Sequence, residues 1–193
     1  MEIILASASP RRKELLELIN LKFEIKASNI EEIMNENLSL EEKVEDLSYQ
    51  KANDTASKLS GDYLVIGADT IVEINGEILG KPKDKTDAKR MLKLLSGKEH
   101  HVITAITLIP TNDKDNFIKI HEKTKVKFIE LDDYKIDKYI DSGEPMDKAG
   151  AYAIQGLGVM FVKGIEGCYT NVVGLPIPLL TNILENKFQL KLI

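Results

Sequence analysis

The sequence predicts an α/β fold, with a mixed, strongly twisted sheet, flanking helices and a central cleft. Short apolar runs of strand length alternate along the chain with longer segments of helical periodicity. The chain has 193 residues, 43% of them hydrophobic, which is enough for one sizeable core. No repeat, low-complexity tract or linker interrupts the pattern. We therefore expect one domain over residues 1–193, with two lobes around the cleft.

Composition and charge restrict the class of protein. The formal net charge of -5 argues against general nucleic-acid binding and against a basic membrane-surface role. The single cysteine, Cys168, excludes an intramolecular disulfide and a multi-cysteine metal site. Because no segment resembles a signal peptide or reaches transmembrane length, we expect a soluble cytoplasmic protein without nucleic-acid or membrane partners. The sequence leaves open whether it forms a homodimer.

Residues 3–19 predict a strand followed by a helix. Ser9 is a good helix N-cap, and Pro10 suits the first helical position. Arg11 and Arg12 are locally unfavourable there, because the N-terminal end of a helix is the positive end of its dipole. A bound phosphate would offset their charge and match the paired donors of arginine. The alternative is a solvated basic helix start.

The remaining elements follow in alternating order. Ser39 and Glu42 form a capping box, and Asn75-Gly76 favours a hairpin turn. Residues 28–39 are expected to form a polar connection, and the glycine-rich residues 143–174 short strands and loops. We expect strands near residues 22–27, 63–66, 71–79, 101–109 and 117–129, and helices near 39–59, 86–95, 131–142 and 176–185.

Asp69 follows the apolar strand 63–66 after Gly67 and Ala68. A strand that ends there would place the carboxylate at the carboxyl edge of the sheet, where open α/β sheets bind ligands. The two small residues would let a substrate approach the backbone. Asp69 could hold a divalent metal or accept a proton from an attacking water. An ordinary turn or cap is the alternative.

Two lysines are candidates for phosphate binding. Lys81 lies between Gly80 and Pro82, which restrict its backbone; an exposed surface lysine is the alternative. Lys51 continues the apolar stripe of its helix, so we expect it to point inward or along a cleft wall. Its alternative is a side chain that extends along apolar surface to water.

Two further groups complete the set of candidates. Glu31 and Glu32 could join Asp69 in binding Mg²⁺ or Mn²⁺, which prefer oxygen ligands, although adjacent glutamates in a polar loop are commonly solvated surface. Gln155 offers a donor and an acceptor, as reading a nucleobase edge requires. Its glycine-rich surroundings could also be a structural turn.

Taken in order, these motifs resemble the Maf-like nucleotide pyrophosphatases, also called septum-formation-inhibitor proteins. The resemblance spans nearly the whole chain and implies an inosine-triphosphatase-like fold. The matching pieces are Leu5-Ala6-Ser7 with Ser9-Pro10-Arg11-Arg12, Gln50-Lys51-Ala52, Gly67-Ala68-Asp69-Thr70, Gly80-Lys81-Pro82, Leu95-Ser96-Gly97, Lys148-Ala149-Gly150-Ala151-Tyr152 with Ile154-Gln155-Gly156, and Val173-Gly174-Leu175-Pro176.

The resemblance implies metal-assisted hydrolysis of a nucleoside triphosphate to the monophosphate and pyrophosphate, with Mg²⁺ or Mn²⁺ as cofactor. The chain has arginine, threonine and glutamine at positions 12, 70 and 155, and in these residues it resembles the branch of the family that acts on dTTP and UTP. The implied roles are proton acceptor for Asp69, substrate choice for Arg12, Thr70 and Gln155, phosphate binding for Ser9, Arg11, Lys51 and Lys81, and metal binding for Glu32 and Asp69.

Two positions depart from the pattern of the family. Asn29 stands where many relatives have Asp, which removes one charge from the metal site and makes Glu32 the expected ligand. Ala153 replaces a frequent Gly, which would narrow the pocket beside Gln155. The second name of the family suggests an alternative function, a nucleotide-sensing regulator of cell division without essential catalysis. Asp69 favours the enzyme, because a sensor needs no proton acceptor.

Overall fold

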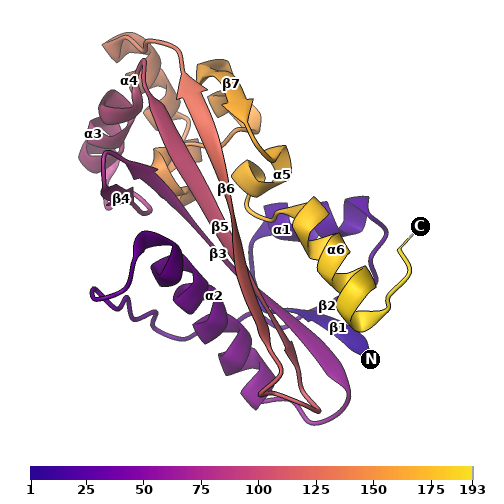
Figure 1. Ribbon diagram of the computed structural model, residues 1–193. Helices are drawn as coiled ribbons and strands as arrows, with labels where there is room; N and C mark the ends of the chain where they lie inside the picture. The colour runs from indigo at the N-terminus through magenta and orange to yellow at the C-terminus, as the bar shows by residue number, and fades with distance from the viewer. Residues whose placement is uncertain (193) are drawn as a thin grey trace. The chain divides into compact units, whose positions relative to one another are not determined.

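Seven strands pair into one mixed sheet in the computed structural model, which describes residues 1–192 (Figure 1). The strand order is β2-β1-β3-β5-β6-β7, and β4 pairs with β3 outside this path. β1 is parallel to both β2 and β3, whereas β4 is antiparallel to β3 and β7 to β6. This mixed sheet with its helices confirms the predicted α/β class.

The elements occur near the positions that the sequence predicts. The strands are β1 (Glu2–Leu5), β2 (Glu24–Ile25), β3 (Tyr63–Ile74), β4 (Glu77–Leu79), β5 (Glu99–Pro110), β6 (Ile118–Phe128) and β7 (Val162–Glu166). The α-helices are α1 (Pro10–Leu18), α2 (Leu40–Ser57), α3 (Lys85–Leu95), α4 (Asp133–Asp141), α5 (Tyr169–Val173) and α6 (Ile177–Phe188). Three 3₁₀-helices are η1 (Glu144–Asp147), η2 (Ala149–Ala151) and η3 (Gly156–Phe161).

The chain divides into two compact units. The first comprises Met1–Asp69, Thr104–Glu122 and Gly174–Ile193, and the second comprises Thr70–Ile103 and Lys123–Val173. Strands β3, β5 and β6 each contribute residues to both units. The expectation of a single domain with a central cleft stays a prediction.

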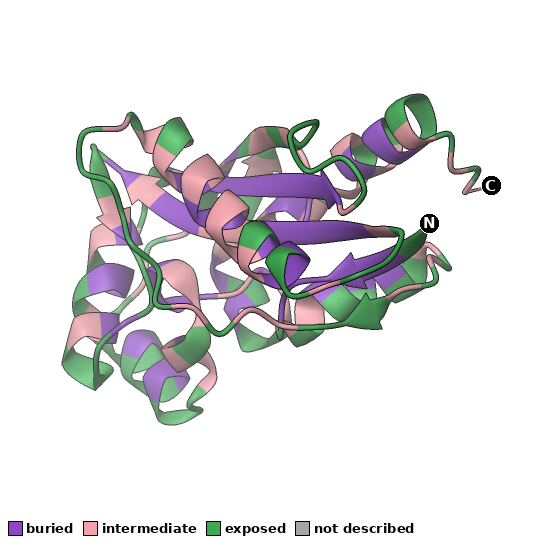
Figure 2. Ribbon diagram, turned by 90° about the horizontal axis from the view of Figure 1, so that it is seen from below, coloured by how far each residue is buried: buried purple, intermediate pink, exposed green. Residues whose placement is uncertain are grey.

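In the first unit, α2 packs closely against β3. Its capping box forms as predicted, because Ser39 Oγ accepts from the Glu42 N–H and the Glu42 carboxylate accepts from the Ser39 N–H at 2.9 Å. Its buried residues are Val44, Leu47, Ser48, Ala52, Thr55 and Ala56, and much of the rest of the helix is intermediate in exposure (Figure 2). A Cβ at Gly67 would lie 2.5 Å from Ser48 O and 2.7 Å from Ala52 Cβ. The lack of a side chain at Gly67 therefore allows α2 to pack closely against β3. This corrects the expectation that Gly67 lets a substrate approach the backbone.

In the second unit, α3, α4 and the 3₁₀-helices enclose a separate apolar core. Phe128 contacts Tyr152 and Phe161 edge-on, with ring centroids 4.6 Å and 6.1 Å apart. The expectation of short strands and loops over residues 143–174 is only partly right, because this segment forms η1, η2, η3 and α5 beside β7. Gly150 and Gly156 both adopt φ of +67°, a left-handed conformation that separates one turn from the next.

No helix within residues 1–192 is both long and apolar enough to cross a membrane.

Candidate active site

The first part of the site is the N-terminal end of α1, which follows the short turn after β1. Pro10 takes the first helical position and Ser9 the N-cap position, as predicted. The side chain of Ser9 makes no capping bond, however; its backbone N–H donates to Ser7 Oγ at 3.3 Å. The first turn holds no acidic residue. The first turn therefore has no acidic side chain of its own to offset the positive end of the helix dipole.

Arg12 is buried and forms hydrogen bonds with three separate segments of the first unit. It retains 9% of its exposed surface. Its Nε donates to Gly174 O at 2.8 Å, and its Nη1 donates to Ala68 O at 2.8 Å and to Ser7 Oγ at 3.1 Å. Burial lowers the pKa of the guanidinium, while the charge of Asp69 opposes this shift. Arg12 thus links the segment after β1 and the connection before α6 to the middle of β3.

Asp69 lies within a strand and not beyond its end, which corrects the expectation from the sequence. Strand β3 continues through Gly67, Ala68 and Asp69 to Ile74. β1 pairs with β3 only as far as Ile66, and β4 pairs from Val72 onward. Asp69 therefore lies just past the carboxyl end of the parallel strand β1. The strand continues because β-branched residues on both sides of a small pair favour extended backbone.

Lys51, Asp69 and Glu32 form a three-residue ionic cluster in the first unit. The Lys51 Nζ lies 2.5 Å from Asp69 Oδ1 and 3.1 Å from Glu32 Oε1. The side chains of Lys51 and Asp69 are only 16% and 14% exposed, whereas that of Glu32 is 44% exposed. The prediction that Lys51 points inward is confirmed. Its ammonium holds two carboxylates at a common point.

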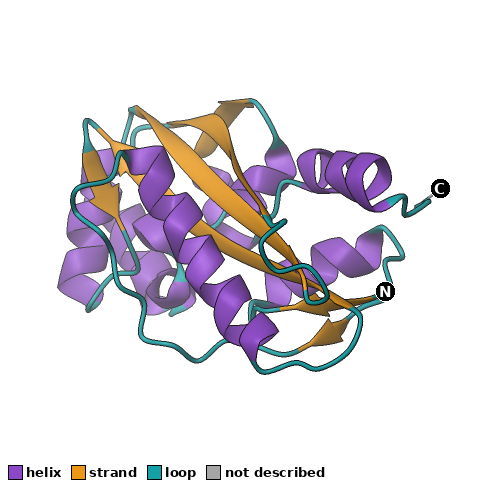
Figure 3. Ribbon diagram, turned by 60° about the horizontal axis from the view of Figure 1, so that its bottom comes forward, coloured by secondary structure: helices purple, strands orange, loops and turns teal. Residues whose placement is uncertain are grey.

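Gln50 supports this cluster, a role that the sequence did not reveal. Glu32 lies in the long connection between β2 and α2, drawn as a loop in Figure 3. The Gln50 side chain accepts from Ile33 N at 3.1 Å and donates to Ile33 O at 2.7 Å. This two-point contact with the backbone fixes the loop beside Glu32. Its position next to Lys51 in the motif was the available signal.

The donor set is compatible with a hard divalent cation. Glu32 and Asp69 place carboxylate oxygens around one cationic group, and Mg²⁺ and Mn²⁺ prefer such ligands. No group of three His, Cys, Asp or Glu side chains suited to a metal occurs among residues 1–192. Two carboxylates suffice for Mg²⁺ only if water and substrate oxygens complete its shell. Glu31 is exposed and makes no contact with this pair.

The other predicted site residues, Thr70, Lys81 and Gln155, belong to the second unit. Thr70 is half-buried in β3, and Lys81 is exposed after β4. Gly80 O accepts from Gly150 N at 3.0 Å, so the backbone beside Lys81 is attached to η2. Gln155 is half-buried at the start of η3. Each of the two units thus carries its own part of the predicted set.

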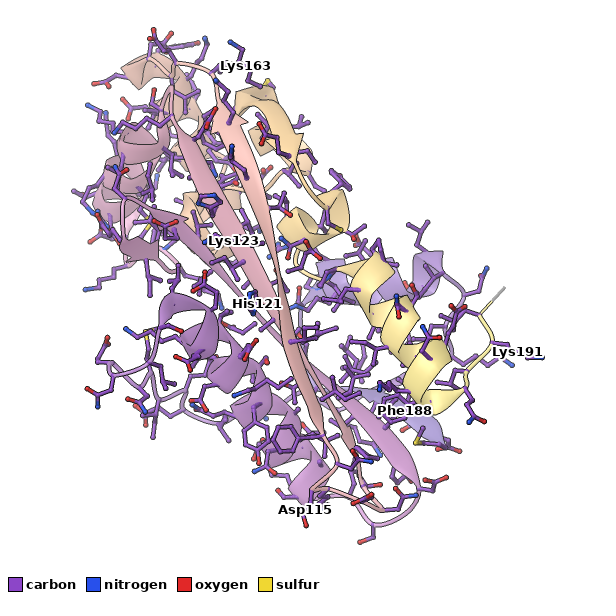
Figure 4. The ribbon with its side chains drawn as sticks, in the orientation of Figure 1. Asp115, His121, Lys123, Lys163, Phe188 and Lys191 are labelled. Atoms are coloured by element: carbon purple, nitrogen blue, oxygen red, sulfur yellow. The ribbon has the colours of Figure 1, made fainter. Side chains whose placement is uncertain are left out.

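The three histidines of the chain contact residues outside the predicted site. His121 on β6, labelled in Figure 4, lies 2.7 Å from Glu45 through its Nδ1. His101 contacts Glu73 at 3.1 Å, and His100 Nε2 lies 2.7 Å from Tyr152 Oη. None of these contacts involves a predicted site residue.

Comparisons with known proteins identify close relatives. A protein of Ruminiclostridium cellulolyticum named dTTP/UTP pyrophosphatase is 60% identical over 95% of this chain and 94% of its own. Proteins of the same name from Alkaliphilus oremlandii and Bacillus pumilus are 54% and 52% identical, over 100% and 95% of this chain and 99% and 95% of theirs. The solved structure of the Staphylococcus aureus Ham1 protein matches with a TM-score of 0.44 and 14% identity, over 66% of this chain and 72% of that chain.

The family model described as "Maf-like protein" matches residues 2–187, which include every predicted site residue. That match covers more than nine-tenths of the chain, and the relatives named above extend over nearly all of it. The chain therefore belongs to the Maf-like protein family.

Proposed function

We propose that this chain hydrolyses dTTP and UTP to the monophosphate and pyrophosphate. The observation that carries the proposal is its 60% identity, over 95% of its length, to a relative named dTTP/UTP pyrophosphatase. The ionic cluster and the helix α1 supply chemistry suited to this reaction. They bring a carboxylate and several cations to one end of the strand β1.

Asp69 is the proposed proton acceptor. Attack of water on the α-phosphorus of the triphosphate forms a new P–O bond, and the bond to the leaving pyrophosphate breaks. Asp69 takes the proton that the water loses. The Lys51 ammonium, 2.5 Å from Asp69 Oδ1, holds this carboxylate in place.

The positive groups of the first unit are proposed to hold the phosphates. Arg11 and the first-turn N–H groups of α1 would bind phosphate in the way that helix N-termini do. Arg12 acts differently, because three of its hydrogen bonds go to groups of the protein itself. Its buried positive charge stabilises phosphate oxygens through the field it creates, while its hydrogen bonds fix the segment after β1 and the connection before α6. Ser9 and Lys81 are further candidates for phosphate contact.

A divalent metal, Mg²⁺ or Mn²⁺, is proposed as cofactor, held by Glu32 and Asp69. When bound, it neutralises charge on the triphosphate and on the leaving pyrophosphate. Glu32 and Asp69 would hold it beside the Lys51 ammonium, which contacts both carboxylates. Thr70 and Gln155 are proposed to determine which base is accepted.

A panel of nucleoside triphosphates tests the function directly. With Mg²⁺ or Mn²⁺ present, dTTP and UTP should give the monophosphate and pyrophosphate without a diphosphate intermediate. Release of orthophosphate and diphosphate would overturn the assignment of the broken bond. A preference for purine triphosphates would overturn the substrate class while leaving the family unaffected.

A further inference from the structure

Gln155 begins a 3₁₀-helix that it does not cap itself. It is the N-cap residue of η3, with φ of -93° and ψ of 167°, but its side chain makes no capping hydrogen bond. The exposed N–H groups at the start of a helix need an acceptor when they are not solvated. Another residue must therefore supply that acceptor if the Gln155 amide is to stay available for a ligand.

Glu144, from η1, is that acceptor. Its Oε2 accepts from Leu157 N at 3.0 Å and its Oε1 accepts from Gly158 N at 3.1 Å. These are the second and third residues of η3, the positions that an N-cap side chain normally serves. Burial opposes ionisation, yet the hydrogen bonds from Leu157, Gly158 and Tyr139 hold the pKa of Glu144 below its ordinary value.

Tyr139 extends the same arrangement to the residues before Gln155. Its hydroxyl donates to Glu144 Oε1 at 2.9 Å and accepts from Ala153 N at 3.3 Å. The ring is buried on α4 and packs edge-on against Phe161, with centroids 4.8 Å apart. The backbone is thus held two residues before Gln155 and two residues after it.

Two glycines after Gln155, Gly156 and Gly158, make room for these side chains. A Cβ at Gly156 would lie 2.7 Å from Glu144 Oε2, and one at Gly158 would lie 2.9 Å from Tyr139 Oη and 2.3 Å from Ala153 O. Real Cβ atoms essentially never show distances below 3.0 Å, so a side chain at either position would force a neighbour to shift. At Gly158 one such neighbour is the backbone of Ala153, and Gly156 has a positive φ that other residues rarely adopt. Glycine at both positions therefore leaves room for the carboxylate and the phenol.

We propose that Glu144 and Tyr139 are positioning residues that set the substrate specificity of the pyrophosphatase by fixing the backbone on both sides of Gln155. This inference rests on the proposed function, in which Gln155 reads the base. Neither residue needs to touch the substrate. They replace the capping function that Gln155 would otherwise perform, and so leave its amide to the ligand.

The test compares substrate selectivity between Tyr139→Phe and Glu144→Gln. Tyr139→Phe keeps the ring that packs on Phe161 and removes only the hydroxyl. Glu144→Gln leaves one of the two N–H groups facing an amide nitrogen. In both variants we expect the ratio of kcat/KM for dTTP over dGTP to fall about tenfold, mainly through KM for dTTP. The controls are Tyr134→Phe, an exposed phenol on the same helix, and Glu166→Gln, an exposed carboxylate on β7.

A second variant shows whether the effect passes through Gln155. In a Gln155→Ala background, Tyr139→Phe and Glu144→Gln should change the dTTP-to-dGTP ratio no further, because nothing is left to position. A readout without catalysis is the amide NMR signals of Leu157 and Gly158. Both should shift as Glu144 titrates in the parent, and neither should in Glu144→Gln.

The outcomes separate the two proposals. If the parent does not prefer dTTP, the proposed function is wrong and this inference with it. If the parent prefers dTTP but Tyr139→Phe keeps the parental ratio, only the positioning role is overturned. A lower melting temperature with an unchanged ratio also overturns it, because that result is a structural role alone. If Glu144→Gln lowers the dTTP-to-dGTP ratio further in the Gln155→Ala background, Glu144 does not act on specificity through Gln155.

Discussion

The two units of this chain hold their predicted site residues in different ways. In the first unit, Lys51 and Asp69 lie on a regular helix and a regular strand, and their charges fix each other directly at 2.5 Å. In the second unit, Gln155 is neutral and begins a short 3₁₀-helix that is held by a carboxylate and a phenol from elsewhere in the sequence. Hydrolysis of a phosphate needs charged side chains at fixed positions, and regular helices and strands hold such side chains well. Recognition of a base needs a side-chain amide that makes no other hydrogen bond, so other residues must hold the backbone around it.

The largest effect should come from Asp69→Asn, which tests the chemical role of the first unit. Asparagine keeps the size of the side chain but loses its negative charge and basicity. We expect kcat for dTTP to fall about 10²–10⁴-fold, the usual contribution of a general base. The melting temperature should change little. Asp115→Asn, in the exposed turn between β5 and β6 (Figure 4), is the control. Steady-state rates within about tenfold of the parent would show that Asp69 is not the base.

Arg12→Ala tests whether the first unit also depends on a charge for its stability. Removal of the guanidinium leaves Gly174 O and Ala68 O without their donors. Hydrogen bonds to charged groups contribute more than neutral ones, so we expect a loss of about 3 kcal/mol in the free energy of unfolding. Arg11→Ala, which changes the half-buried neighbour, should alter stability much less while still reducing turnover. Equal unfolding midpoints in urea for the two variants would contradict the structural role of Arg12.

The pH dependence of unfolding tests the second unit. Burial, with a smaller contribution from His101 and opposed by Glu73, lowers the pKa of His100 to about 4. Its Nδ1 is buried without a hydrogen-bond partner in residues 1–192. Below pH 6.5 the unfolded chain binds a proton that the folded chain excludes. Stability present above that pH should therefore decline by about 3 kcal/mol as the pH falls toward 4.

Urea unfolding of His100→Gln across this pH range provides the comparison. The variant should lose most of the pH dependence, whereas His121→Gln in the first unit should retain it, since His121 is 32% exposed beside Glu45. Parallel curves for the parent and His100→Gln would show that another group is responsible.

Gln155→Ala should have the smallest effect. It separates the recognition of the base in the second unit from the effect of charge in the first unit. The loss of one neutral hydrogen bond costs roughly 0.5–1.5 kcal/mol. We expect the ratio of pyrimidine to purine turnover to shrink, while Arg12→Ala affects both the ratio and the rate. Substrate panels for the two variants measure this. An unchanged ratio in Gln155→Ala would remove Gln155 from the specificity set.

The sequence predicts the first unit better than the second for a physical reason. Helical periodicity places Lys51 on the inner face of α2, and the capping box marks where that helix begins. Both are local properties. The course of β3 through Asp69 depends on pairing with distant strands, and Gly67 is required by the packing of α2. The sequence therefore predicts an important Asp69 but the wrong end for its strand.

In the second unit the decisive contacts are not local at all. Glu144 precedes the residues it caps by more than ten positions, and no periodic pattern connects them. The glycines at 156 and 158 were the only available sign, since each marks a close approach by some other group. The spacing of these two glycines does not indicate that Glu144 and Tyr139 are the side chains that approach them.

Hydrolysis of dTTP in H₂¹⁸O is the direct test of water attack at the α-phosphorus, because the position of the label reports which phosphorus the water attacks. Attack at the α-phosphorus, with Asp69 accepting the proton, places ¹⁸O in the thymidine monophosphate and leaves the pyrophosphate unlabelled. Mass spectrometry of the two products distinguishes the outcomes. We expect one ¹⁸O per monophosphate formed; label in the pyrophosphate, or in orthophosphate released beside a diphosphate, would show that water attacks a different phosphorus.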